Sequence, residues 1–239
     1  MSNDVFRFKQ FSIHHDRCAM KVGTDGVLLG AWGSVEGKQI LDIGTGTGLI
    51  ALMAAQRNPE AEVLGIDIDP EAVLQAKENI AESPFYSRVR CILCDFRDAD
   101  FSSANTSFDT ILCNPPFFTE DTLPDDVGRA LARNNKSLPF DRLIPKAASL
   151  LADEGKFSVI IPSRLVTDFV SLCLQNGLHL ERRCLVRTTM KKPPRRTLMT
   201  FSKNVPSTMS DVPSTELCLQ NPDGSRSQAY QELTKDFYL

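Results

Sequence analysis

The stretch Ile40-Leu-Asp-Ile-Gly-Thr-Gly-Thr-Gly48 decides the fold of this chain, because it joins an apolar run to a glycine-rich turn. We predict that Ile40–Ile43 is a buried strand and that a helix runs from Thr47 to about Arg57. Glycines at such a turn let the backbone bend sharply and approach a ligand without a Cβ in the way. The stretch therefore predicts a strand, a ligand-binding turn and a helix in succession.

Downstream of this unit, apolar strands alternate with amphipathic helices. The further expected strands are Glu62–Ile68, Arg88–Cys94, Phe108–Cys113 and Lys156–Ile161. The expected helices are Pro70–Glu82, Leu138–Ala152 and Ser163–Gln175, and a hairpin-like pair follows at Leu178–Arg187 and Arg195–Ser202. Because each parallel crossover needs a helix, this order predicts an α/β fold with a doubly wound, mostly parallel Rossmann-like sheet and helices on both faces.

The chain is predicted to have three parts: an N-terminal extension that packs on the core, a main domain, and a polar excursion with a C-terminal helix. Their boundaries are residues 1–33, 34–204 and 205–239. Val205–Gln228 is rich in Ser, Pro, Thr and Asp, and we expect a linker or poorly ordered segment before a last helix, Tyr230–Leu239. Phe118–Lys136 has no apolar period, so we expect a mobile loop there.

The composition is that of an ordinary globular protein, with 239 residues of which 42% are hydrophobic and 24% charged. The longest apolar run, Leu49–Ala55, is far shorter than the roughly 20 residues of a membrane span, and Met1–Gln10 lacks the apolar region of a secretory signal. Seven cysteines at irregular spacing indicate a reducing cytoplasm. Cys91-Ile-Leu-Cys94 has the form of a metal or redox pair. In a strand its two side chains would face opposite ways, so we expect core cysteines and no metal.

Asp42 and the glycines Gly44, Gly46 and Gly48 form the first candidate binding site. The dinucleotide fingerprint has the spacing G-x-G-x-x-G and places a pyrophosphate at the helix N-terminus. Here the spacing is G-x-G-x-G, and a carboxylate two residues before the first glycine would repel a pyrophosphate. The same carboxylate suits the amino group of a methionine moiety, directly or through water. The motif therefore favours S-adenosylmethionine over NAD as the cofactor.

Two more acidic residues follow predicted strands. Asp67 ends the second strand, where a carboxylate can accept both hydroxyl protons of a ribose. Asp95 ends the third strand and could accept from the exocyclic amine of the cofactor's adenine, while Phe96 covers the ring. Either acid alone could be a solvated strand end. Acids at the C-terminal edges of three successive strands favour a ligand instead, because ligands of open α/β sheets bind at that edge.

The fourth predicted strand ends in Asn114-Pro115-Pro116-Phe117, and the two prolines stiffen the turn. An adenine N6 amine is a poor nucleophile because its lone pair is delocalised into the ring. If the Asn114 oxygen and the Pro115 carbonyl accept its two N–H groups, the nitrogen pyramidalises and its lone pair can point at a methyl group. Phe117 would stack on the target base. The alternative is a plain Asn-Pro-Pro turn.

Positive charge is concentrated between Glu181 and Lys203. This segment has eight basic residues and one acidic residue, so it carries +7 in a chain of net charge −3, and the remainder carries −10. Such a strip on an acidic body suits phosphate contacts confined to one face. The alternative is a solvated pair of strands. The candidate RNA contacts are Lys191, Lys192, Arg195 and Arg196.

The segment Asn114-Pro115-Pro116-Phe117 after two apolar residues resembles the N-P-P-[FYW] signature of class I amino-methyltransferases. Nearly the whole chain, apart from residues 205–228, resembles the bacterial tRNA1(Val) adenine-37 N6-methyltransferase family. The stretches that carry this resemblance are Met20-Lys-Val-Gly-Thr-Asp-Gly-Val-Leu-Leu-Gly-Ala-Trp32, Pro193-Pro-Arg-Arg-Thr-Leu198 and Leu233-Thr-Lys-Asp-Phe-Tyr-Leu239. The resemblance implies a seven-stranded sheet and methyl transfer from S-adenosylmethionine to the adenosine next to the anticodon of a valine tRNA.

Three alternatives remain open. The first is that the substrate is an adenine in another RNA, whose methylation would use identical chemistry. A protein glutamine N5-methyltransferase presents the same N–H₂ group to Asn-Pro-Pro, but it usually carries a helical N-terminal recognition domain, and only about 33 residues precede the core here. A nucleotide-binding or RNA-chaperone module without activity would give no reason for Asn114 and Phe117. We expect a cytoplasmic monomer that binds tRNA and no membrane.

Overall fold

The computed structural model describes residues 4–18, 21–99, 101, 107–116, 138–205 and 212–239. The strands of its main sheet are β3 (Gln39–Ile43), β4 (Glu62–Asp67), β5 (Val89–Leu93), β6 (Phe108–Cys113), β7 (Leu151–Pro162), β8 (His179–Arg187), β9 (Arg196–Ser202) and β10 (Ser214–Cys218). Its helices are α1 (Thr24–Trp32), α2 (Leu49–Arg57), α3 (Pro70–Ala81), α5 (Phe140–Leu150), η3 (Ser163–Leu165), α6 (Val166–Gln175) and α7 (Gln228–Thr234). A separate small sheet pairs β1 (Val5–Arg7) with β2 (Ser12–His14).

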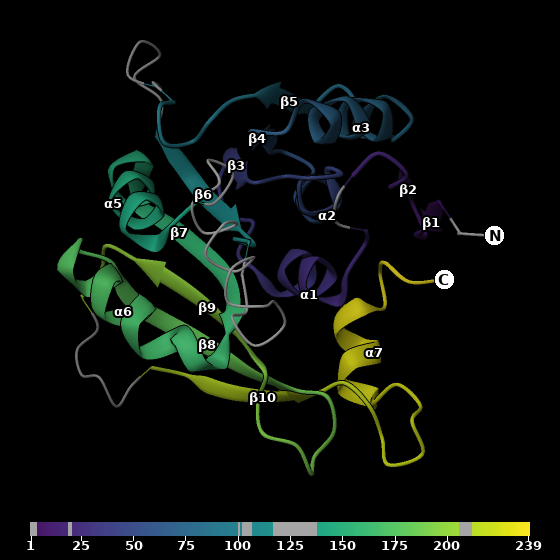
Figure 1. Ribbon diagram of the computed structural model, residues 1–239, viewed down its shortest axis with the longest axis vertical. Coiled ribbons are helices and arrows are strands. Elements are labelled where there is room, and N and C mark those ends of the chain that lie inside the picture. The colour runs from purple at the N-terminus through teal and green to yellow at the C-terminus, as the bar shows by residue number, and fades with distance from the viewer. Residues whose placement is uncertain (1–3, 19–20, 100, 102–106, 117–137, 206–211) are drawn as a thin grey trace, which may run out of the picture.

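The strand order in the main sheet is β10-β8-β9-β7-β6-β3-β4-β5 (Figure 1). β3 pairs in parallel with both β4 and β6, and parallel pairing continues from β4 to β5 and from β6 to β7. β9 is antiparallel to β7 and to β8, and β10 is parallel to β8. Helices α2, α3 and α5 connect the parallel strands. The predicted doubly wound α/β class of fold is therefore confirmed.

The main sheet has one strand more than the seven that the family resemblance implied. The additional strand, β10, lies within Val205–Gln228, so the prediction of a linker or poorly ordered segment was wrong for those residues. β10 is mostly polar, and Leu217 is its one buried residue, so its sequence has almost no apolar pattern. It pairs with β8, and an ion pair between Arg187 and Glu216 joins the two strands.

The other elements lie close to the predicted ranges, with three local differences. β7 begins at Leu151, within the helix predicted over Leu138–Ala152 and before the strand predicted at Lys156–Ile161, because Leu151 already pairs with Phe108 of β6. The last helix ends at Thr234 and not at Leu239. Cys91 is buried in β5, but Cys94 follows the strand and is half-buried. No helix in the described ranges is long and apolar enough to span a membrane.

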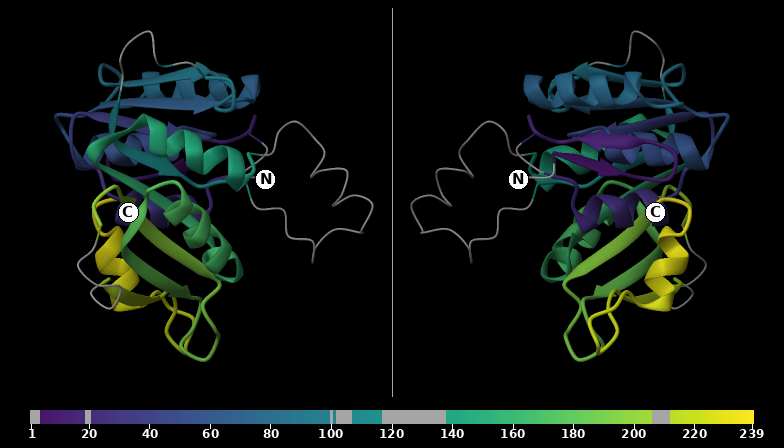
Figure 2. Two further views of the ribbon diagram at one scale, coloured as in Figure 1. Left: turned by 90° about the vertical axis from the view of Figure 1, so that its left-hand side faces the viewer. Right: turned by 90° about the vertical axis from the view of Figure 1, so that its right-hand side faces the viewer.

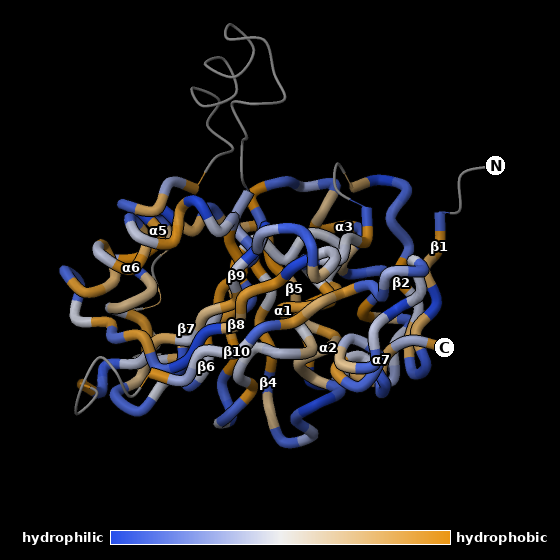
Figure 3. The backbone as a smooth tube through the Cα atoms, turned by 90° about the horizontal axis from the view of Figure 1, so that it is seen from below, coloured by the Kyte–Doolittle hydropathy of each residue, from blue (hydrophilic) through white to orange (hydrophobic). Residues whose placement is uncertain are grey.

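Two hydrophobic cores cover the two faces of the main sheet. Helices α1, α2, α3 and α7 pack on one face, and α5 and α6 pack on the other (Figures 1 and 2). Because side chains alternate along a strand, β9 contributes Leu198 to the first core and Met199 and Phe201 to the second. The hydrophobic stretches follow these packed strands and helix faces, whereas many connecting loops are hydrophilic (Figure 3).

The beginning and the end of the described chain pack against each other. The Lys9 N–H donates to the Phe237 carbonyl at 2.8 Å, and the Phe8 and Tyr238 rings stack with their centroids 6.0 Å apart. Phe8 also belongs to the core formed by α1 and α2. The division of the chain at residues 33/34 and 204/205 stays a prediction.

The parallel strands have their C-terminal ends at one edge of the sheet, and the residues of the candidate site lie at this edge. Ile43 of β3 pairs with Cys113 of β6, so Gly44 and Asn114 leave neighbouring strands at the same level. Asp67 lies at the end of β4, and the strand pairing brings the residues after β5 to the same edge. The polar residues at the ends of β3, β4, β5 and β6 therefore lie along one edge of the sheet.

The turn between β8 and β9 also lies at this edge. β9 is antiparallel to β7, and Arg196 at the start of β9 is opposite Pro162 at the end of β7. The Ser163 N–H donates to the Arg195 carbonyl at 3.2 Å, which holds the base of the turn against the chain after β7. Residues 188–195 are thus placed on the same side of the sheet as Asn114.

Candidate active site

The glycine turn between β3 and α2 has three residues in the left-handed region: Gly44, Gly46 and Gly48, with φ of 70°, 54° and 81°. Residues that carry a Cβ rarely adopt this region. The N–H groups of Gly44 and Thr45 both donate to the Ile66 carbonyl, at 2.9 and 3.0 Å. The turn is therefore fastened to β4 at the edge where the parallel strands end.

Two of the three glycines face open space. A Cβ built on Gly44 or Gly46 would have no atom of the described residues within 4 Å, whereas one on Gly48 would lie 3.4 Å from the Ala76 Cβ in α3. The absence of a side chain at Gly48 therefore lets the turn pack closely against α3. At Gly44 and Gly46 it leaves the backbone accessible to a ligand. The turn has the room that a closely bound ligand requires.

The Asp42 side chain is fully buried at the end of β3. Its Oδ2 atom accepts hydrogen bonds from the Thr45 hydroxyl at 2.6 Å and from the Ala51 N–H of α2 at 3.1 Å. Its Oδ1 atom has no hydrogen-bond partner among the described residues. Burial raises the pKa of Asp42 to about 7; the charge of Asp67 adds to this rise, and the two hydrogen bonds oppose it. A buried carboxyl group with one unsatisfied oxygen fits the cationic group of a ligand, directly or through water.

Asp67 at the end of β4 faces the glycine turn. Its Oδ2 atom accepts from the Gly46 N–H at 2.8 Å, and its Oδ1 atom accepts from the Asp69 N–H at 3.0 Å. Each oxygen has a second lone pair, so the predicted contact with ribose hydroxyls remains open to this half-buried side chain. Cys18 lies near these acids: burial raises the pKa of its thiol to about 11, and the charges of Asp67 and Asp69 add to the rise.

Asp95 and Phe96 follow β5 and have different surroundings. The Asp95 carboxylate accepts a forked set of hydrogen bonds from the Arg97 guanidinium, at 2.5 to 3.0 Å, and this pairing lowers the pKa of Asp95. Phe96 is buried in the core on the α5 side, with the Lys146 amine 5.4 Å from its ring centroid. The predicted contacts of Asp95 and Phe96 with an adenine stay predictions. The sequence did not single out Arg97 or Lys146.

Asn114 begins the turn after β6, next to the glycine turn. Its side chain is half-buried and makes no hydrogen bond to any residue that the structure describes. Pro115 is buried and Pro116 is exposed, so the first proline packs against the protein while the second faces solvent. Phe117 lies outside the described residues, as does the expected loop Phe118–Lys136.

The predicted RNA contacts at the start of β9 fall into two groups. Lys191, Lys192 and Arg195 are exposed, and their side chains make no hydrogen bond or ion pair with the described part of the chain. Arg196 instead donates from Nε to the Asp25 carboxylate at 2.7 Å, which joins β9 to α1. The sequence predicted one common role for these four cations. The structure shows that one of them, Arg196, is paired with an acidic side chain of the same chain.

Other cations of the strip are engaged within the protein. Arg182 stacks on the Trp32 ring, with its guanidinium carbon 3.9 Å from the ring centroid, and donates to the Trp32 carbonyl at 2.9 Å. Arg187 pairs with Glu216 at 2.9 Å, and Lys203 donates to the Leu151 carbonyl at 2.7 Å. Arg183 of β8 is exposed and donates to the Ser214 hydroxyl, so most but not all of the solvent-facing positive charge of the strip lies in the β8–β9 turn.

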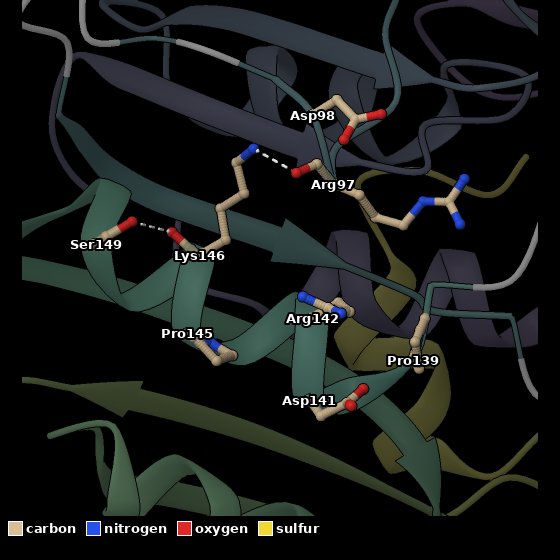
Figure 4. A pocket seen from close by; sticks show the side chains of 8 residues that line it. All are labelled: Arg97, Asp98, Pro139, Asp141, Arg142, Pro145, Lys146 and Ser149. Atoms are coloured by element: carbon tan, nitrogen blue, oxygen red, sulfur yellow. Dashed lines mark hydrogen bonds between the residues drawn. The ribbon is translucent and has the colours of Figure 1, made fainter.

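A pocket of about 820 Å³ opens between α5 and the residues after β5 (Figure 4). The Lys146 amine donates to the Arg97 carbonyl at 3.1 Å. The mixture of positive and negative side chains suits a polar ligand, and no motif in the sequence predicted the pocket. The charged residues that line it are Arg97, Asp98, Asp141, Arg142 and Lys146.

Residues 34–203 match a family model described as a methyltransferase domain. The fold is similar to that of a predicted O-methyltransferase from Agrobacterium tumefaciens, with a TM-score of 0.67 and 18% identity over 89% of this chain and 96% of that one. It is also similar to the ribosomal protein L11 methylase from Lactobacillus delbrueckii subsp. bulgaricus, with a TM-score of 0.51 and 20% identity over 75% and 77% of the two chains. The family match, the fold and the glycine turn define a class I S-adenosylmethionine-dependent methyltransferase.

Curated relatives narrow this class to one family. The chain is 42% identical to the tRNA1(Val) (adenine(37)-N6)-methyltransferase of Bacteroides thetaiotaomicron and 44% identical to that of Phocaeicola vulgatus, in each case over 100% of this chain and 99% of the relative. It is 40% identical to the enzyme of the same name from Escherichia coli O157:H7, over 98% of this chain and 94% of the relative. The chain belongs to the tRNA1(Val) (adenine(37)-N6)-methyltransferase family.

The raised pKa of Asp42 predicts that cofactor binding depends on pH. The carboxylate is charged above about pH 7, and its attraction for a cationic group is lost as the pH falls through 7. We expect the calorimetric Kd of S-adenosylmethionine to rise by up to about tenfold per pH unit between about pH 7 and pH 5.

The Asp42→Asn variant is the control for this titration. It should bind the cofactor more weakly than the unmodified protein at about pH 8, and its Kd should change much less as the pH is lowered. An equal pH dependence in the two proteins would show that a group other than Asp42 is responsible.

Proposed function

We propose that this protein transfers the methyl group of S-adenosylmethionine to the N6 amine of adenosine-37 in tRNA1(Val). The observation that carries the proposal is the place of Asn114, whose carboxamide leaves β6 beside the glycine turn and is not hydrogen-bonded by the described residues. An amide oxygen there can accept an amine hydrogen close to the bound cofactor. The names of the relatives from Bacteroides, Phocaeicola and Escherichia support the tRNA and the nucleotide.

S-adenosylmethionine supplies a methyl group that its positively charged sulfur makes electrophilic. The bare backbone at Gly44 and Gly46 and the unsatisfied oxygen of Asp42 fit this cofactor, because they offer a close approach and a partner for a cationic group. Asp67 would accept hydrogen bonds from the ribose hydroxyls. The residues that we propose hold the cofactor are Asp42, Gly44, Gly46, Gly48, Asp67, Asp95 and Phe96.

Asn114 and Pro115 would act on the target amine. The Asn114 oxygen and the Pro115 carbonyl would accept its two N–H groups, which draws the nitrogen lone pair out of conjugation and directs it toward the cofactor. Phe117 would stack on the adenine after the base has left its loop stack. Transfer then depends on alignment and on these hydrogen bonds, with no strong general base, because the methylated nitrogen is cationic and loses its extra proton to water.

The β8–β9 turn would hold the RNA. Its exposed cations lie at the same edge of the sheet as Asn114, and the remainder of the chain is acidic, so an RNA backbone is attracted to this turn and repelled elsewhere. We propose Lys191, Lys192 and Arg195 as phosphate contacts. Arg196 was predicted as a fourth contact, but its side chain pairs with Asp25, so we do not include it among the exposed contacts.

We further propose that the protein acts as a cytoplasmic monomer. All seven cysteines have free thiols, which supports a reducing compartment.

Asn114→Ala should lose turnover while it keeps the cofactor. Loss of one preorganised polar contact costs roughly 10²–10³ in rate, and Asn114 is expected to contact the target amine and not the cofactor. The measurements are methyl transfer to unmodified tRNA and calorimetric binding of S-adenosylmethionine. Asn204→Ala is the matched control, because Asn204 follows β9 at the opposite edge of the sheet and donates to Glu154. Methylation by Asn114→Ala at the control rate would mean that the Asn-Pro-Pro turn is only structural.

Removal of the three exposed cations should weaken tRNA binding in a salt-dependent way. Each neutralised phosphate contributes about −0.7 to −0.9 to the slope of log affinity against log salt. The triple variant Lys191→Ala/Lys192→Ala/Arg195→Ala should therefore flatten that slope by about 2 to 3 if all three contact phosphates. Cofactor affinity should stay unchanged.

The matched control for this experiment removes three exposed cations away from the turn, at Lys38, Lys77 and Arg90. It lowers the net charge of the chain by the same amount. Equal slopes for the two triple variants would mean that the β8–β9 turn is a solvated surface with no role in RNA binding.

A further inference from the structure

Asn79 of α3 is fully buried and joins three parts of the chain. Its Oδ1 atom accepts from the His14 N–H at 2.8 Å, and its Nδ2 atom donates to the His14 carbonyl at 3.0 Å. The same Nδ2 atom donates to the Thr47 carbonyl at 2.9 Å. One carboxamide therefore links α3, the N-terminal strand β2 and the glycine turn.

Three polar side chains near Asn79 contact the N-terminal segment and not the glycine turn. Gln75 accepts from the Arg17 N–H at 3.1 Å, and Glu78 pairs with the Arg17 guanidinium at 2.8 Å. Glu82 lies 3.2 Å from the His14 ring nitrogen Nε2. Among the described side chains of α3, the Asn79 carboxamide is the one that hydrogen-bonds the glycine turn.

Thr47 is the residue between two left-handed glycines, Gly46 and Gly48. Glycine-rich backbone has many accessible conformations, so a turn of this composition loses much entropy when it is ordered. The peptide groups at its start are held by Ile66, and the carbonyl near its end is held by Asn79. The open backbone at Gly46 lies between these two attachments.

We propose that Asn79 is a positioning residue of the cofactor site, which holds the glycine turn in its binding conformation through the hydrogen bond to the Thr47 carbonyl. The inference rests on the proposed use of this turn for S-adenosylmethionine and is independent of the RNA substrate.

The chemistry of the site requires an amide at position 79. Two carbonyls and one N–H surround the side chain, and a carboxamide supplies two donors and one acceptor to match them. A carboxylate of the same shape accepts only, and it would face two carbonyl oxygens without a proton between them. The Asn79→Asp substitution therefore removes the donors without changing the volume of the side chain.

Calorimetric binding of S-adenosylmethionine to Asn79→Asp and Asn79→Ser tests the proposal. We expect a Kd about 10- to 100-fold higher, as for the loss of a buried hydrogen bond that orders a ligand site, with the KM for tRNA unchanged. At saturating cofactor, kcat should fall much less than the affinity, because Asn79 does not touch the amine. A Kd within about twofold of the unmodified protein, in a variant with native circular dichroism, would overturn the proposal.

Gln75→Glu is the matched control, since it also replaces a buried amide of α3 that contacts the N-terminal segment but not the glycine turn. It should leave the Kd close to that of the unmodified protein. An equal loss in Gln75→Glu would assign the effect to the N-terminal segment and would contradict the role of the Thr47 contact.

A measurement on the unmodified protein does not depend on the folding of a variant. The Asn79 side-chain amide resonance in a nitrogen–proton NMR spectrum should shift when S-adenosylmethionine is added, and an unshifted resonance at saturation would overturn the proposal. If the unmodified protein does not bind S-adenosylmethionine at all, the proposed function fails as well; if it binds and the Asn79 variants bind equally, only the role of Asn79 fails.

Discussion

The attachment of the glycine turn to β4 is the constraint on which the rest of the site depends. Two N–H groups at the start of the turn share the Ile66 carbonyl, and the Gly46 N–H is held by Asp67. These hydrogen bonds stabilise left-handed backbone that is open to a ligand. Burial is the main cause of the raised pKa of Asp42, and the charge of Asp67 adds to the rise. Asp67 therefore takes part both in the backbone structure of the turn and in the electrostatics of the site.

The sheet topology brings the chemistry of separate segments to this turn. Parallel pairing of β3 with β6 places Asn114 beside Gly44, and the reversal of direction at β9 returns the basic turn 188–195 to the same edge. Ion pairs use some of the strip's cations internally, so the charge available to a partner is limited to a small part of an acidic surface. Such an arrangement restricts where a polyanion can bind, even though the chain has a net charge of −3.

Local patterns predicted the parallel core, the glycine turn and the Asn-Pro-Pro turn. Each of these structures is determined by a few consecutive residues, such as the apolar run Ile40–Ile43 and the two prolines after Asn114. β10 was missed because it has one buried side chain and is stabilised by pairing with β8. The bond from Asn79 to His14 spans 65 residues and the pair of Arg196 with Asp25 spans 171, so no local window contains either contact. Contacts of this kind follow from tertiary packing and not from sequence spacing.

The identity of the methylated nucleoside tests the central claim most directly. Unmodified bacterial tRNA would be incubated with the protein and S-adenosylmethionine carrying a deuterated methyl group, digested, and analysed by mass spectrometry. We predict that the label appears in N6-methyladenosine, in the anticodon-loop fragment of tRNA1(Val) that contains position 37. Label in a different nucleoside or fragment, or no transfer by a protein that binds the cofactor, would contradict the assignment of Asn114 to an adenine N6 amine.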